Sequence, residues 1–262
     1  MIRALFTAAT GLQAQQMNTD VIANNIANAN TPGFKRDRLN FQDLLYQTYR
    51  RAGQSTLTGS MVPNSLRVGH GVRPIATQKL FIVGVAQQTG NPLDLMISGE
   101  GFFQVTMADG SAAYTRDGTF KIDSEGNIVT ADGLYIEPAI SIPEGAVRIE
   151  VASDGTVSVL IGNETTLTQV GQVQLARFQN PAGLETIGQN LFRETDASGD
   201  AVTGSPGEEG FGQIAQGFIE ASNVSIVDEL IQLIIAQRAF ETNSRAVDVA
   251  DQLLNIANNL AR

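Results

Sequence analysis

The sequence predicts an α+β fold, in which helices from the two ends of the chain pair as a coiled-coil-like inner domain and an antiparallel, β-rich outer domain lies between them. Near both termini, apolar residues recur every seven positions, the spacing of helices that pack in a coiled-coil-like seam. Between them, short apolar stretches alternate with Asp-Gly and Gly-Asn pairs, which is typical of antiparallel hairpins. The length of 262 residues is sufficient for one large domain or two small ones.

Residues 3–29 are predicted to form the first helix, which Pro32 and Gly33 end. Four asparagines between positions 24 and 30 make this helix marginal by itself, so we expect it to be ordered only when it is packed. The residues predicted to form its seam are Leu5, Leu12, Ile22 and Ile26.

Residues 222–262 are predicted to form a second, longer helix, with Ser225 and Asp228 as a capping-box-like start. It is apolar on several sides, so more than one neighbour must cover it. Its predicted seam residues are Ile226, Leu233, Phe240, Val247 and Leu254, with a second seam position at Ala236, Asn243, Ala250 and Ala257.

The segment 22–27 reappears almost unchanged as 256–261. Either this repeat is chance in an Ala- and Asn-rich sequence, or both terminal helices use the same small-residue packing in one bundle.

The middle of the chain, residues 76–190, is predicted to be an antiparallel β domain, with a Gly-, Ser- and Asp-rich return loop at 194–213. The predicted strands lie at 93–97, 102–106, 113–116, 119–122, 128–130, 147–151, 157–161 and 170–178.

Residues 46–71 have little core character and are punctuated by glycine and proline. They are too many for an ordinary connection, which leaves a disordered loop or a functional arm. Alternation at 55–58 and 65–68 favours an extended hairpin that reaches a neighbouring subunit. The residues predicted to make such contacts are Tyr46, Leu57, Leu66 and Val68.

The predicted division of the chain therefore has four parts. These are an N-terminal helix of the inner domain (1–30), a linker with the extended arm (31–75), the β domain with its return loop (76–215) and the C-terminal helix of the inner domain (216–262).

The sequence contains no constellation that suggests an enzyme. It has no Cys and a single histidine, His70, which lies between two glycines in the polar arm. The loops at 123–127 and 196–200 resemble the start of a calcium loop, but their glycine stands at the fourth place and not the sixth, and the final glutamate is missing. We therefore expect no catalytic residues, no metal and no cofactor.

The net charge of −10 is unevenly distributed. Residues 1–51 carry six basic and three acidic groups, whereas the remainder carries eleven basic and twenty-four acidic groups. This polarity could guide head-to-tail association, or the acidic part could simply aid solubility. No basic stripe suggests a nucleic-acid partner, and no apolar stretch approaches the roughly 20 residues that membrane insertion needs.

Five segments resemble the signatures of bacterial flagellar rod and hook proteins. The first is Ala23-Asn-Asn-Ile-Ala-Asn-Ala-Asn-Thr-Pro-Gly-Phe-Lys-Arg36, and the matching C-terminal signature lies at 221–225 and 237–245. The β-domain motifs of this family resemble residues 99–105 and 113–120. Segments 41–48 and 71–77, and the additional arm, are most similar to the distal rod members.

This resemblance implies a structural subunit rather than an enzyme. Its terminal helices would line a hollow tube, its β domain would face outward, and copies would stack helically into the rigid distal rod that transmits motor torque to the hook. The implied partners are other copies of the chain, proximal rod proteins, the hook protein and the P- and L-ring bushing around the rod. The implied location is the basal body, where the rod spans the periplasm.

The resemblance also implies export through the flagellar type III apparatus. The interrupted apolar run of the first residues agrees with this, because we find no site for signal-peptide cleavage.

Two other functions remain open from the residues alone. The chain could be another axial protein, of the proximal rod or the hook, or a cell-surface binding module with helical anchors.

Overall fold

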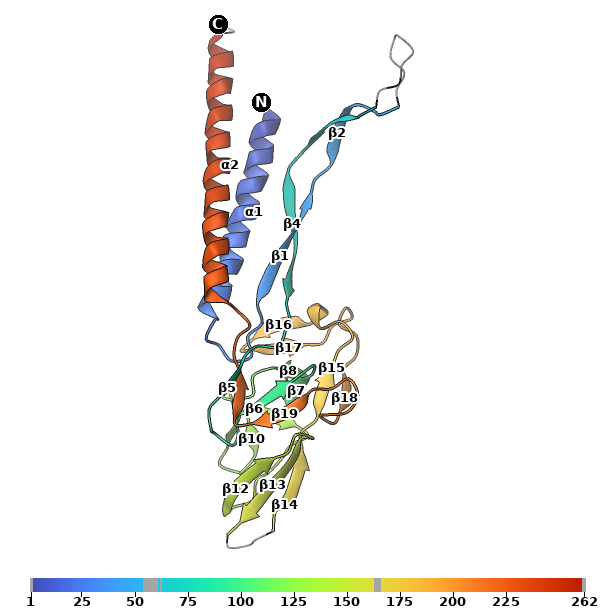
Figure 1. Ribbon diagram of the computed structural model, residues 1–262, viewed down its shortest axis with the longest axis vertical. Helices are drawn as coiled ribbons and strands as arrows, with labels where there is room; N and C mark the ends of the chain where they lie inside the picture. Colours follow the sequence, from blue (N-terminus) through green and yellow to red (C-terminus); the bar gives the residue numbers. More distant parts are fainter. Residues whose placement is uncertain (1, 54–60, 62, 163–165, 261–262) are drawn as a thin grey trace. The chain divides into compact units, whose positions relative to one another are not determined.

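A computed structural model describes residues 2–53, 61, 63–162 and 166–260 (Figure 1). These residues divide into two compact units. The first comprises the described parts of 1–27, 37–78 and 225–262, and the second comprises 28–36 and 79–224. The predicted α+β class is confirmed, because two terminal helices flank a β-rich middle with antiparallel sheets.

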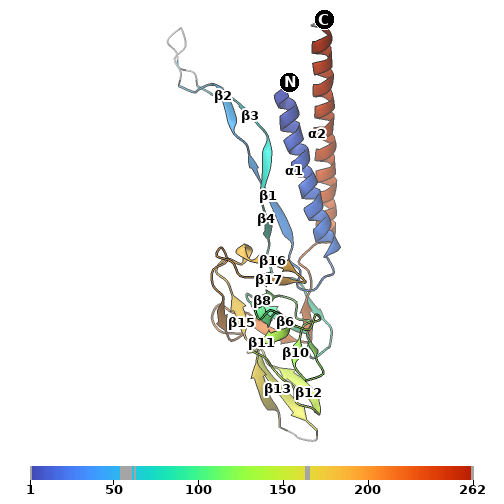
Figure 2. The same cartoon turned by 180° about the vertical axis from the view of Figure 1, so that it is seen from behind.

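The first unit contains two helices, α1 (Ile2–Ala27) and α2 (Ile226–Leu260), which lie side by side and antiparallel (Figures 1 and 2). The α2 helix begins four residues later than the predicted position 222. The reason is that Asn223 is held in an extended segment, where its amide nitrogen donates to the carbonyl of Leu80 at 2.8 Å and its amide oxygen accepts from the backbone of Arg36 at 2.8 Å. At the start of α2, the Ser225 hydroxyl accepts from the backbone N–H of Asp228 at 3.4 Å.

The first unit also contains two pairs of strands. One pair is β1 (Asp37–Asp43) with β4 (Val72–Lys79), and the other is β2 (Tyr46–Arg50) with β3 (Leu66–Gly69). The second pair is antiparallel, with Tyr46 opposite Gly69 and Thr48 opposite Arg67. The chain therefore runs out along β1 and β2 and returns along β3 and β4 as one extended ladder (Figure 2).

The second unit is built from antiparallel sheets. Its nine-stranded sheet has the order β16-β17-β8-β7-β11-β10-β9, and β15 pairs with both β7 and β18. These strands are β7 (Phe102–Thr106), β8 (Ala112–Thr115), β9 (Lys121–Ile122), β10 (Ile128–Val129), β11 (Tyr135–Glu137), β15 (Leu175–Arg177), β16 (Glu185–Gly188), β17 (Leu191–Arg193) and β18 (Val202–Gly204).

Three smaller sheets complete this unit. They are β12-β13-β14, β6 with β19, and β5 with β20. Their strands are β5 (Ala86–Gln88), β6 (Leu95–Ser98), β12 (Ala146–Val151), β13 (Thr156–Ile161), β14 (Thr168–Gln172), β19 (Gln213–Gln216) and β20 (Phe218–Glu220). A single turn of 3-10 helix spans Pro181–Gly183.

The predicted strand at 170–178 is two strands in the structure. β14 pairs with β13, whereas β15 pairs with β7, so the chain changes sheets between them. The intervening Val173 is fully buried, and its backbone N–H donates to the carbonyl of Gly155 at 2.8 Å. The return loop likewise contains the short strand β18, which pairs with β15.

The core of the second unit lies between its sheets. Phe103 and Phe120 are buried at its centre, with ring centroids 5.1 Å apart in an edge-to-face arrangement. A second, aromatic cluster forms around Phe102, Tyr114, Phe178 and Phe192. The aliphatic residues packed around Phe103 and Phe120 are Leu95, Ile97, Ile128, Ile136, Ile140, Ile142, Val157, Val159, Val173, Leu175 and Ile214.

Replacing Phe103 with Ala should lower the free energy of unfolding of the β-rich unit by about 3–5 kcal/mol, because it leaves a cavity at a fully buried position. Urea unfolding followed by circular dichroism measures this change. Val147, which is 71% exposed on β12, is the control, and Val147→Ala should change stability by less than about 0.5 kcal/mol. Equal destabilisation by both variants would contradict the assigned core.

Candidate self-assembly surfaces

The seam between α1 and α2 consists largely of small residues. α1 buries Ala8, Ala14 and Ile22, and α2 buries Ala236 and Ala250. At Gly11 the helices approach so closely that an added Cβ would lie 2.9 Å from the side-chain nitrogen of Asn243. Within one chain, the tightest contacts on α2 are therefore made at the second predicted seam position.

The residues predicted for the main seam lie beside these contacts. Ile22 is buried, whereas Ile226 and Phe240 are 45% and 42% exposed. Burial within one chain does not test a role in assembly, so all of them stay candidates for contacts between chains. The half-buried members of the set are Leu5, Leu12, Ile26, Leu233, Val247 and Leu254.

Both helices also carry large apolar side chains that none of the described residues covers. On α1, Ile2 and Phe6 are 63% and 67% exposed. We call the exposed apolar residues of the two helices the apolar helix face. Exposed apolar surface of this extent marks an interaction site. On α2 it comprises Ile226, Val227, Leu230, Ile231, Ile234, Ile235, Phe240, Val249, Leu253, Ile256 and Leu260.

The arm presents a second candidate surface. Tyr46, Leu66 and Val68 on its paired strands are 55%, 56% and 44% exposed. The fourth predicted residue, Leu57, lies outside the described residues. A hydrogen bond with the carboxylate of Asp43 raises the pKa of the Tyr46 hydroxyl.

The base of the arm is packed against α1. Gly71 has a φ of +112°, and a Cβ at this position would overlap the hydroxyl of Thr10. The same hydroxyl accepts from the backbone N–H of Val72 at 3.4 Å. Glycine at position 71 is therefore required by this close approach and by its backbone conformation.

A second contact joins α1 to the arm, because a guanidinium nitrogen of Arg3 donates to the hydroxyl of Tyr49 on β2.

A buried charge cluster, formed by Lys35, Arg116 and Glu220, lies in the second unit. The Lys35 ammonium is 2.5 Å from one carboxylate oxygen of Glu220, and a guanidinium nitrogen of Arg116 is 3.4 Å from the other. Burial lowers the pKa of Lys35 and of Arg116, and the carboxylate of Glu220 opposes both shifts. Two cations thus depend on one buried anion.

Backbone groups complete this cluster. The Glu220 carboxylate accepts from the N–H of Gly84 at 2.7 Å, and Lys35 donates to the carbonyl of Ile82 at 2.8 Å. Arg116 donates to the carbonyl of Gly99 at 2.8 Å. Further hydrogen bonds therefore support the ions, as buried charges require, although the Nε of Arg116 has no hydrogen-bond partner among the described residues.

The cluster joins the segments that carry the family resemblance. Lys35 belongs to the first segment, Gly99 and Arg116 to the two β-domain segments, and Glu220 directly precedes the C-terminal segment 221–225. Gly33 fits the same site, because its φ is +69° and a Cβ there would lie 2.6 Å from the backbone nitrogen of Asp117. The cluster was not predicted from the sequence, although charged residues inside or beside all these segments were a usable signal.

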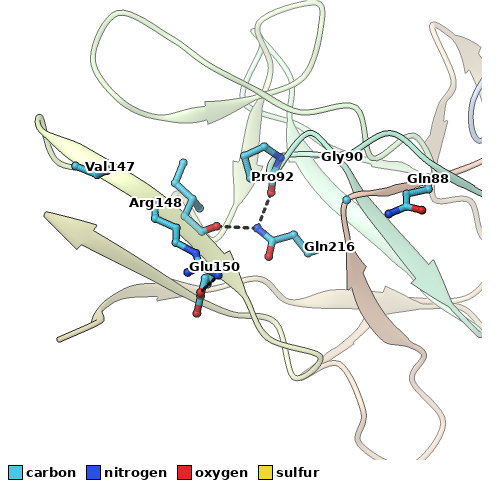
Figure 3. Close-up of a pocket in the computed structure, with 10 residues that line it drawn as sticks. Gln88, Gly90, Pro92, Val147, Arg148, Glu150 and Gln216 are labelled. Carbon is cyan, nitrogen blue, oxygen red and sulfur yellow. Dashed lines mark hydrogen bonds and ion pairs between the residues drawn. The ribbon is translucent and has the colours of Figure 1, made fainter. Parts of the chain in front are cut away.

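The second unit also has an open depression between β12 and the strands near β19 (Figure 3). The Gln216 side chain crosses it and donates to the carbonyls of Pro92 and Ile149 at 2.8 and 2.9 Å. Arg148 and Glu150 form an exposed ion pair at its rim. Because Gln216 also accepts from the backbone of Val151, this amide ties β12 to its neighbours.

The described residues contain no group of three or more His, Asp or Glu side chains that could hold a metal ion. Within the same ranges, no helix is long and apolar enough to cross a membrane.

Three families match parts of the chain. Residues 5–35 match "Flagella basal body rod protein", residues 96–159 match "Flagellar hook protein FlgE/F/G D1 domain", and residues 215–260 match "Flagellar basal body rod FlgEFG protein C-terminal".

Several full-length relatives carry the name "Flagellar basal-body rod protein FlgG". The chain is 48% identical to that of Borreliella burgdorferi over the whole of both chains, and 48% identical to that of Caulobacter vibrioides over 99% of each. It is 38% identical to that of Bacillus subtilis, again over the whole of both chains.

Replacing Glu220 with Ala should destabilise the β-rich unit by about 3–5 kcal/mol, because two buried cations lose their counter-ion. Thermal or urea unfolding of the full chain measures the change. The matched control is Glu185→Ala, which breaks the exposed pair with Arg193 and should cost less than about 1 kcal/mol. If Glu220→Ala is as stable as Glu185→Ala, the cluster does not hold the unit together.

Proposed function

The chain belongs to the FlgG family of flagellar basal-body rod proteins, and we propose that many copies of it stack helically into a hollow tube, the distal rod. Its full-length relatives support a structural subunit of the distal rod. The rod would act as a rigid drive shaft that carries motor torque across the periplasm and outer layers to the hook. We expect no catalytic activity from this protein.

The observation that carries helical stacking is the apolar helix face. Phe6 on α1 and Ile234 on α2 are 67% and 58% exposed. Pairing of the two helices leaves these side chains in water, so further copies of the chain are needed to cover them. Contacts that repeat from one copy to the next build a helical filament when the rotation between copies does not close into a ring.

The proposed partners follow from the place of the rod in the flagellum. They are proximal rod proteins, the hook protein and the P- and L-ring bushing around the rod. The family places the protein in the basal body. Export through the flagellar type III apparatus without signal-peptide cleavage is our expectation for how it arrives there.

The arm is proposed to make contacts along the tube. Its exposed Tyr46, Leu66 and Val68, together with Arg50 and Arg67 on the paired strands, could bind a neighbouring copy. Such contacts would resist the compression and extension that bending requires. The arm would then make the tube straight and stiff.

Electron microscopy of the purified protein tests the proposal directly. A filament-forming subunit should produce uniform tubes as its concentration rises. A cell-surface binding module should stay dispersed at every concentration, which would contradict the proposal.

Replacing Phe240 with Ala should raise the concentration needed for assembly by about tenfold or more, since each copy loses an apolar contact worth over about 1.4 kcal/mol. Sedimentation of tubes measures this concentration. Phe240 is 42% exposed and lies on α2, outside the β-rich unit. The free energy of unfolding of the β-rich unit should therefore not change. Val147→Ala, which also shortens an exposed apolar side chain, should assemble like the parent. Normal assembly of Phe240→Ala would remove this residue from the interface.

Deleting residues 46–71 and bridging the ends with a short Gly/Ser linker should leave a protein that polymerises into bent or curved tubes. The pairing of β1 with β4 survives this deletion, so the base of the arm is kept. Electron micrographs of the tubes provide their curvature and stiffness. Tubes as straight and stiff as those of the parent would show that the arm does not confer rigidity.

A further inference from the structure

One face of α2 repeats every seven residues. Glu229, Ala236, Asn243, Ala250 and Ala257 occupy the same position in successive heptads. Ala236 and Ala250 are buried against α1, and Asn243 faces Gly11. Small side chains at equal intervals pack almost equally well in more than one alignment, so apolar packing distinguishes poorly between two registers that differ by one heptad.

The exception on this face is Glu229. Its side chain is fully buried, and one carboxylate oxygen accepts from the side-chain nitrogen of Asn25 at 3.3 Å. Asn25 is also buried, at 1% exposure, near the end of α1. A buried polar pair therefore lies at one end of a seam whose other positions on α2 are Ala236, Asn243, Ala250 and Ala257.

The orientation of Asn25 is fixed by the backbone of β1. Its amide nitrogen donates to the carbonyl of Asp37 at 2.9 Å, and its amide oxygen accepts from the N–H of Asp37 at 2.9 Å. The side chain can therefore not turn away if Glu229 moves. Asn25 thus fixes a point on α1 at which a hydrogen-bond acceptor of α2 is required.

Two contacts define the observed register. Asn25 meets Glu229, and Gly11 meets Asn243. The two contacts lie two heptads apart along α1 and also along α2. A slip of one heptad would place Ala236 beside Asn25 and Ala250 beside Gly11. The small side chains of Ala236 and Ala250 leave room for this slip, but it breaks the hydrogen bond between the buried Asn25 and Glu229, which is costly.

We propose that Asn25 and Glu229 are a register lock that selects one alignment of α1 and α2 during assembly. This inference rests on the proposed function, because the register matters most in a polymer. A slip of one heptad would displace the apolar side chains of α2 by about 10 Å relative to those of α1. Neighbouring copies bind both helices at once, so copies in different registers could not share one helical lattice.

The absence of cysteine from the chain provides a direct test. Gly11→Cys with Asn243→Cys reports the observed register, because a Cβ at position 11 lies 3.2 Å from the side-chain carbon of Asn243. Gly11→Cys with Ala250→Cys reports the slipped register. Assembled tubes are oxidised briefly, and the disulfide formed within each chain is measured from gel mobility and intact mass.

The parent should cross-link mainly through positions 11 and 243. Asn25→Leu, which removes the polar partner but keeps side-chain volume, should shift the ratio of the two cross-links toward positions 11 and 250 by about fivefold or more. Glu229→Leu should do the same. Glu229→Gln is the matched control, since its amide oxygen can still accept from Asn25, and it should keep the parental ratio.

A disrupting variant that does not assemble alone is mixed as a minority with parent subunits without cysteine. The register lock predicts that it is excluded from the sedimented tubes, whereas Glu229→Gln enters them; normal entry of the disrupting variants would contradict the lock. Unchanged cross-link ratios in Asn25→Leu and Glu229→Leu would overturn the register lock. Failure of the parent to form tubes would instead contradict the proposed function, so the two failures are distinguishable.

Discussion

The constraint on which the structure depends is that the two terminal helices expose more apolar surface than their own pairing covers. α1 and α2 contact each other through small residues such as Ala14 and Ala236. Larger residues, such as Phe6 and Ile234, remain exposed. Small residues permit a close approach of the two backbones, and the large ones are left available for other copies. In the proposed polymer, other copies of the chain would bury these exposed side chains.

The second unit meets a different requirement, because its core must hold together within a single chain. Phe103 and its neighbours provide most of the apolar burial. The cluster of Lys35, Arg116 and Glu220 adds a polar centre where the segment after α1 meets the strand that precedes α2. The segments that resemble rod and hook proteins therefore have a shared physical explanation, since residues within or next to them build this centre.

The sequence predicted the fold class, both helices and most strands of the central sheet, because heptad spacing and alternation are local patterns. It did not predict β18, or the division of 170–178 into β14 and β15, since pairing with distant strands determines these elements. The candidate surfaces were partly predictable. The heptads predicted Leu233 and Phe240 as candidates for contacts, but the tight contact of Gly11 with Asn243 and the burial of Glu229 depend on how the two helices meet.

Hydrogen exchange, compared between a proven monomer and assembled tubes, tests the central claim most directly. If the helices need other copies to cover their apolar side chains, backbone amides across residues 3–29 and 226–258 should exchange rapidly in the monomer and become strongly protected in the tube. The β-rich unit should be protected in both states. Strong protection of both helices in the monomer would contradict the account.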